Sequence, residues 1–124
     1  MTNRADLAQM KCEPCEGKTA AFTKKQVLEY LTGTPAWRLD IKNNSISRNF
    51  LMKNFLSAVK FINEVADIAE ADNHHPDVHL TGYRNLKIEL STHAIGGLSE
   101  SDFIVAAKID RLQPELKAER KAHV

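Results

Sequence analysis

The sequence lacks both a strong net charge and a long hydrophobic run. Its 124 residues include 17 lysines and arginines and 16 aspartates and glutamates, for a formal net charge of +1. No strong field therefore favours nucleic acid or an acidic membrane surface as a partner. No apolar stretch approaches the length that spans a bilayer. The first residues, MTNRADLAQMKCEPCEGK, have no hydrophobic segment after their charges, so we expect no secretory signal and a cytoplasmic protein.

Cysteine is also scarce, with only Cys12 and Cys15 present, in C-x-x-C spacing. Four such thiolates would predict a zinc site, whereas two need ligands from elsewhere. A thioredoxin-like site needs a strand before the motif and a helix opening on it, but Pro14 lies between the thiols and Gly17 follows them. We interpret the pair as reduced thiols in an N-terminal loop, with metal binding and redox chemistry as the alternatives.

The hydrophobic fraction of 43% and the charged fraction of 27% are typical of a globular chain. The length predicts one domain over residues 1–124, with an irregular arm over 1–21 and a charged tail over 113–124 that frays or forms a short exposed helix. Thr23 and Gln26 predict a capping box for a helix that stops near Leu31. Alternation predicts a hairpin over 37–41 and 45–50, with Trp37, Leu39 and Ile41 on one face.

Apolar residues at helical spacing predict a second helix over 55–71, capped by Asn54. Its expected core stripe is Phe55, Val59, Ile62, Ala66 and Ala69. A third helix is predicted from Ser99 toward Leu112. Because residues 103–107 are apolar all round, we expect this helix to be covered on more than one side, with another subunit as one candidate cover.

A second hairpin, over residues 77–91, alternates between even-numbered apolar and odd-numbered polar residues. A three-residue loop over 83–85, with Asn85 in the left-handed position, keeps the two parities on separate faces. That register sets Val78 opposite Leu90 and His79 opposite Glu89. It also sets His75 opposite His93. The element order predicts an α+β fold, α-β-β-α-β-β-α, with a four-stranded antiparallel sheet and three helices on one face.

Histidine is the side chain that most readily exchanges protons near neutral pH. His74, His75 and His93 are therefore the candidate acid–base cluster, although adjacent histidines in an extended segment point to opposite faces. A zinc site built from the same three residues is the alternative. His79 is better explained as a cross-strand charge partner.

Other polar residues near the cluster have structural explanations beside functional ones. Glu70 is either a contact of the cluster or a solvated residue in the last turn of its helix. Asp102 completes the capping box begun at Ser99. Ser91 and Thr92 are either ligand contacts or a strand end. Trp37 is expected mainly in the core, with a role as an aromatic wall as the alternative.

The spacing of these residues resembles that of the pterin-4a-carbinolamine dehydratases. The resemblance covers Glu70-x-x-x-His74-His75-Pro76, then Tyr83, His93 and Asp102. It continues in STH at 91–93, GGLSESDF at 96–103, AAKID at 106–110 and CEPCEG at 12–17. It extends over essentially the whole chain up to about Leu112.

The resemblance implies a four-stranded antiparallel sheet with three helices on one side and no metal or organic cofactor. It implies dehydration of 4a-hydroxytetrahydropterin to quinonoid dihydropterin, which recycles the tetrahydrobiopterin-type pterin used by aromatic amino acid hydroxylases. The implied catalytic residues are His74, His75 and His93, supported by Glu70 and Asp102. Trp37 is added as a supporting residue on its aromatic character alone. The implied substrate contacts are Asn73, His74, His75, Ser91, Thr92, His93 and Ala94. Edge strands and the apolar third helix both offer routes to self-association, so we expect a homodimer or homotetramer.

Two positions depart from the family pattern. Asn73 stands where Asp is common, which keeps a carbonyl acceptor and loses a negative charge. Ala94 stands where some animal members carry Glu. Neither change removes an imidazole, so we expect activity to persist. Two other interpretations stay open: a metal-dependent hydrolase, and a non-enzymatic dimerisation cofactor of a transcription factor.

Overall fold

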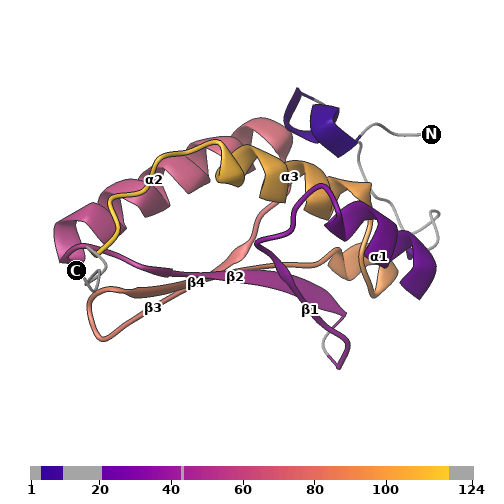
Figure 1. Cartoon of the computed structure of the whole chain (residues 1–124), viewed down its shortest axis with the longest axis horizontal. Helices are drawn as coiled ribbons and strands as arrows, with labels where there is room; N and C mark the ends of the chain where they lie inside the picture. Colours follow the sequence, from indigo (N-terminus) through magenta and orange to yellow (C-terminus); the bar gives the residue numbers. More distant parts are fainter. Residues whose placement is uncertain (1–3, 10–20, 43, 118–124) are drawn as a thin grey trace, which may run out of the picture.

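Four antiparallel strands form one sheet, in the order β1-β2-β4-β3, in a computed structural model that describes residues 4–9, 21–42 and 44–117. The elements are η1 (Arg4–Gln9), α1 (Lys24–Leu31), β1 (Arg38–Asp40), β2 (Ser45–Leu51), α2 (Phe55–Asp72), β3 (Asp77–Thr81), β4 (Asn85–Leu90), η2 (His93–Ile95) and α3 (Glu100–Asp110). All three α-helices lie on one side of the sheet (Figure 1). The predicted α+β class and element order are confirmed.

The helix side of the sheet carries the hydrophobic core. Fully or nearly buried side chains from the strands are Ile46, Phe50, Leu86, Ile88 and Leu90, and those from the helices include Phe61, Val65, Phe103, Ile104 and Ile109. Alternation along each strand directs these residues toward the helices and directs polar residues to the open face. The even-numbered apolar residues of β4 are therefore in the core, as predicted.

Side-chain caps begin the first two helices where the sequence predicted. Thr23 Oγ1 accepts the N–H of Gln26 at 3.2 Å, and Gln26 Oε1 accepts the N–H of Thr23 at 2.8 Å. Asn54 Oδ1 accepts the N–H of Ser57 at 2.8 Å. Each cap satisfies donors that the first helical turn cannot use internally.

The core stripe predicted for α2 is wrong, because most of the buried residues lie about one position before the predicted ones. The buried face is Ser57, Ala58, Phe61, Val65, Ala69 and Asp72. Of the predicted stripe only Ala69 is buried, and Ile62 is half-buried. The helix therefore has two apolar stripes, and its outer one, Phe55, Leu56 and Val59, is exposed. Periodicity could not show which stripe faces the sheet.

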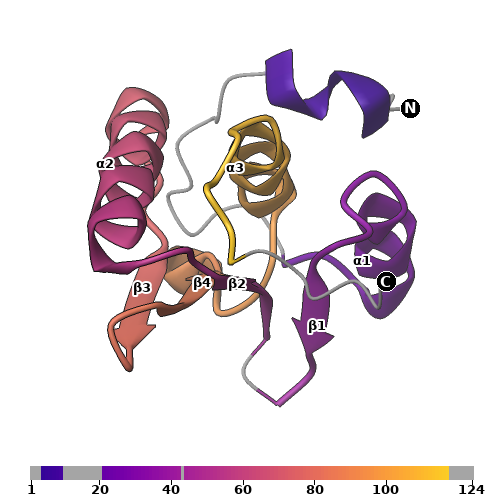
Figure 2. The ribbon, with the colours of Figure 1, turned by 60° about the vertical axis from the view of Figure 1, so that its left-hand side comes forward.

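The third helix, α3, lies between α1 and α2 and is covered from above by η1 (Figure 2). Residues 103–107 are all buried, as their all-round apolar pattern predicted. Part of the cover is the chain's own N-terminal segment, with Leu7 of η1 at 0% exposure, so the burial of this helix requires no second subunit. The expectation of an irregular arm is therefore wrong for residues 4–9. Cys12 and Cys15 lie outside the described residues.

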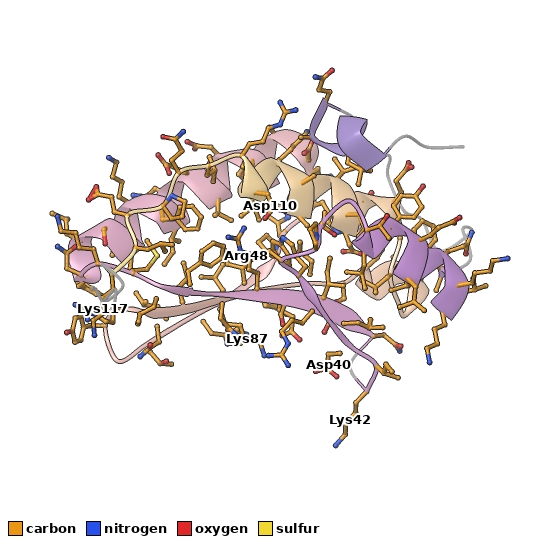
Figure 3. The ribbon with its side chains drawn as sticks, viewed as in Figure 1. Asp40, Lys42, Arg48, Lys87, Asp110 and Lys117 are labelled. Atoms are coloured by element: carbon orange, nitrogen blue, oxygen red, sulfur yellow. The ribbon has the colours of Figure 1, made fainter. Side chains whose placement is uncertain are left out.

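One charged side chain enters the helix side of the sheet. Arg48 of β2 pairs with Asp110 of α3 at 2.5 Å, and Figure 3 shows both between the sheet and the helix. Trp37 is buried, and its Nε1–H donates to the same carboxylate at 2.9 Å. The ion pair explains why an arginine stands at an apolar-face position.

The second hairpin turns one residue earlier than predicted. Its loop is Gly82-Tyr83-Arg84, with φ of 53° at Gly82 and 56° at Tyr83, so Asn85 is not the left-handed residue. Val78 consequently faces Ile88, and Leu80 faces Leu86. A Cβ on Gly82 would stand 2.8 Å from Asn85 Nδ2, so glycine suits this turn sterically as well as in conformation. Both registers keep the apolar face intact, so alternation could not decide between them.

The chain leaves α3 and returns to the end of β2. The N–H of Lys53 donates to the carbonyl of Glu115 at 2.9 Å, and that of Lys117 donates to Leu51 at 2.9 Å. Residues 115–117 are therefore extended, and the expectation that the tail forms a helix or frays is wrong for them. At the other edge, Ile41 lies exposed in a turn and not in the predicted strand.

Candidate functional site

The end of α2 determines where the paired histidines begin. Asn73 takes the left-handed conformation, with φ of 52° and ψ of 42°, and its N–H donates to the carbonyls of Ala69 and Glu70. The N–H of His74 donates to Ala69 at 3.1 Å. Asn is one of the few residues other than glycine that adopts this conformation at low cost. The backbone up to His74 is thus tied to the last turn of the helix.

His74 points inward, toward the first turn of α3. Its Nε2 lies 2.7 Å from Asp102 Oδ1, and its side chain is 14% exposed. Asp102 is 0% exposed. A buried carboxylate is costly unless hydrogen bonds satisfy it, so its other contacts decide the chemistry of the pair.

Asp102 is the centre of this arrangement. Its Oδ2 accepts the hydroxyl of Thr92 at 2.7 Å and the N–H of Ser99 at 3.0 Å. The hydroxyl of Ser99 lies 2.8 Å from Thr92 Oγ1 and must donate there, because the single Thr92 proton goes to the carboxylate. An ionised Asp102 accepts all its bonds, so Nε2 of His74 carries a proton. Nδ1 is then the ring nitrogen left for a substrate.

His75 points outward, as expected for adjacent histidines in an extended segment. Its Nε2 lies 2.5 Å from Glu70 Oε2, and the side chains are 54% and 76% exposed. The predicted contact between Glu70 and the cluster is therefore present. Water competes with this pair far more than with the pair of His74 and Asp102.

His93 opens η2 directly after Thr92, whose hydroxyl reaches Asp102. The predicted pairing of His75 with His93 is wrong, because the strands pair two positions away from that register. The segments of His74 and His93 meet instead through Thr92 and Asp102. Ser91 is half-buried and Ala94 is exposed at the same turn. The predicted capping box of Ser99 and Asp102 is confirmed, but spacing alone did not reveal that Thr92 also holds the carboxylate.

Two other predicted residues lie elsewhere. Trp37 contacts Asp110 in the core, so its aromatic face is not part of the arrangement around Asp102. His79 sits on the open face of the sheet, opposite Lys87, with Nε2 3.8 Å from Glu89 Oε1. It lines a shallow hollow of about 790 Å³ with residues of β2 and β4. His79 was predicted opposite Glu89, which it reaches only diagonally.

Among the described side chains, which do not include that of His93, no three histidine, cysteine or acidic groups lie where they could share a metal ion. The helices within residues 4–9, 21–42 and 44–117 are also too short or too polar to cross a membrane.

A model of the family described as Pterin 4 alpha carbinolamine dehydratase matches residues 20–112, a range that holds the whole arrangement around Asp102. The chain belongs to this family. Two relatives carry the name pterin-4-alpha-carbinolamine dehydratase, which is the name of a hydro-lyase. The family resemblance stated from the sequence motifs is confirmed.

Relatives are similar over most of this chain. Pterin-4-alpha-carbinolamine dehydratase 2, mitochondrial, of Arabidopsis thaliana is 46% identical over 114 residues, which cover 90% of this chain and 61% of that protein. A relative of the same family name from Nitrosomonas eutropha is 45% identical, covering 90% of this chain and 97% of its own. A crystal structure of a transcriptional coactivator/pterin dehydratase from Brucella melitensis is 29% identical, with a TM-score of 0.68, covering 73% of this chain and 95% of that one.

Proposed function

We propose that the chain eliminates water from 4a-hydroxytetrahydropterin to give quinonoid dihydropterin by histidine acid–base catalysis. The observation that carries the proposal is the bond from His74 Nε2 to the buried carboxylate of Asp102, inside a chain of the dehydratase family. We further propose that the reaction returns the pterin to an aromatic amino acid hydroxylase.

The elimination needs two proton movements. The C4a–O bond breaks as the leaving hydroxyl gains a proton, and a proton leaves N5 as the C4a–N5 double bond forms. No net proton is consumed. His74 is suited to accept a proton at Nδ1, because Asp102 stabilises the imidazolium that results. A positioned group of this kind typically contributes a factor of roughly 10² to 10⁴.

In this scheme His93 is the partner of His74 across the reacting carbon. His75 binds and orients the flat ring, with Glu70 holding its tautomer. Thr92 has its hydroxyl committed to Asp102, so its part is to hold the carboxylate while the backbone beside it meets the pterin. Asn73, Ser91 and Ala94 supply the remaining contacts.

The test is a stopped-flow dehydration assay with authentic carbinolamine. We expect His74→Ala and His93→Ala each to lower turnover at least about tenfold. His79→Ala is the matched control, because His79 is an ion-paired histidine of the same chain on the open face of the sheet. Near-parental rates in both cluster variants would refute the assignment. Activity that disappears with a chelator would favour a metal-dependent hydrolase instead.

We also propose that the chain self-associates through the outer stripe of α2. Phe55, Leu56 and Val59 form an exposed apolar row on that helix. Rows of this kind are typical of protein interfaces. The edge strand β3 lies at the same side of the molecule (Figure 2) and offers unpaired backbone groups.

A further inference from the structure

The end of α2 is tied to α3 by a second contact, beside that of His74. Asp72, the last residue of α2, places Oδ2 2.6 Å from Nζ of Lys108 in the last turn of α3. The side chains are 1% and 21% exposed. Asp102 and Lys108 stand six residues apart on α3, about 9 Å along its axis. The contacts of His74 with Asp102 and of Asp72 with Lys108 therefore hold the C-terminal end of α2 at two separate points of α3.

The carboxylate of Asp72 stands in an unfavourable place. The C-terminal end of a helix dipole repels negative charge. Burial adds a desolvation cost, which an ion pair often does no more than offset. Replacement of a buried ion pair by apolar residues of similar volume is often neutral or stabilising. A charged pair that is costly for the fold indicates a role other than stability.

The backbone transmits this contact directly to the histidine. Asp72 is followed by the left-handed Asn73, and the N–H groups of Asn73 and His74 are both bonded to the last turn of α2. His74 therefore follows the last turn of α2, the turn that carries Asp72. We propose that the Asp72–Lys108 ion pair positions His74 against Asp102. Asp72 and Lys108 are positioning residues in this inference, which rests on the proposed function.

The experiment removes the Asp72–Lys108 ion pair without leaving a buried charge. In the double variant Asp72→Asn, Lys108→Met, we expect kcat to fall about 3- to 30-fold, because loss of alignment acts on the reacting atoms. We expect KM to stay within about twofold, since other groups bind the pterin ring. Lys108→Arg keeps the ion pair and should keep parental kcat.

A second readout does not depend on catalysis. Nitrogen-15 NMR of the histidine rings reports the Nε2–H that His74 donates to Asp102, with His74→Ala assigning the signal. We expect this proton signal to broaden or disappear in the double variant. Arg48→Met is the matched control, because it breaks another ion pair to α3 that lies away from His74. It should lower the melting temperature and leave kcat and the His74 signal unchanged.

The outcomes separate the possibilities. Lower kcat together with a lost His74 signal supports the positioning role. Parental kcat, or lower kcat with an intact signal, overturns it. If the double variant does not fold, Lys108→Gln is measured with the same two readouts and the same criteria. If His74→Ala itself keeps full activity, the proposed function fails, and the NMR signal still decides whether the ion pair holds His74.

Discussion

Replacing Asp102 by asparagine tests the centre of the site with almost no change in shape. The new amide must orient one way. Oδ2 accepts both Thr92 and the backbone N–H of Ser99, and that N–H cannot rotate, so the amide oxygen must stay there. The amide NH₂ then faces His74 and requires Nε2 to accept. The ring is forced into the other tautomer, with its proton on Nδ1, where the proposed mechanism needs a lone pair.

The substitution should change two quantities, kcat and the free energy of unfolding. Loss of the base at Nδ1 should lower kcat by roughly 10² to 10⁴. The two retained bonds lose their charge assistance, at about 1 kcal/mol each. The lost carboxylate at the start of α3 adds about 0.5 kcal/mol. Relief of desolvation offsets part of this sum, so we expect a net destabilisation of about 2 kcal/mol. The melting temperature should then fall by about 5–10 °C.

The assay is stopped-flow dehydration at a temperature well below the transition, with ring nitrogen shifts recorded for the tautomer. Glu100→Gln is the control, because it also removes a carboxylate from the first turn of α3, where Glu100 accepts the hydroxyl of Tyr30. Its kcat should stay within about twofold of the parent. A folded Asp102→Asn variant with parental kcat would show that His74 is not the base.

Three further predictions concern assembly and stability. Leu56→Glu should reduce the oligomeric mass measured by light scattering, because it charges the outer stripe of α2; an unchanged mass would show that this stripe is not the interface. Leu7→Ala should destabilise the fold by about 2–5 kcal/mol in urea, because it empties the buried contact between η1 and α3. Asn54→Ala should cost about 1 kcal/mol through the lost cap of α2, and no shift in the urea midpoint would contradict the observed capping box.

Local signals explain why much of the fold was predictable. Caps such as Thr23 and Asn54 act within one helical turn, so their effect can be read without the rest of the structure. The alternation in β4 likewise identified its core face. Sequence patterns that fit two arrangements equally well could not decide between them. Both stripes of α2 have helical spacing, and both hairpin registers keep apolar residues together, so the prediction chose wrongly in each case.

The sequence by itself determined the class of the fold, the family, and the opposite directions of His74 and His75, since these depend on spacing along the chain. Only the tertiary structure decided what holds the site together. Asp102 meets His74 and Thr92, and Asp72 meets Lys108, because α2, α3 and the end of β4 pack at one point. Such contacts join residues far apart in the chain, and no local pattern of charge or hydropathy specifies which distant donor a buried carboxylate will meet.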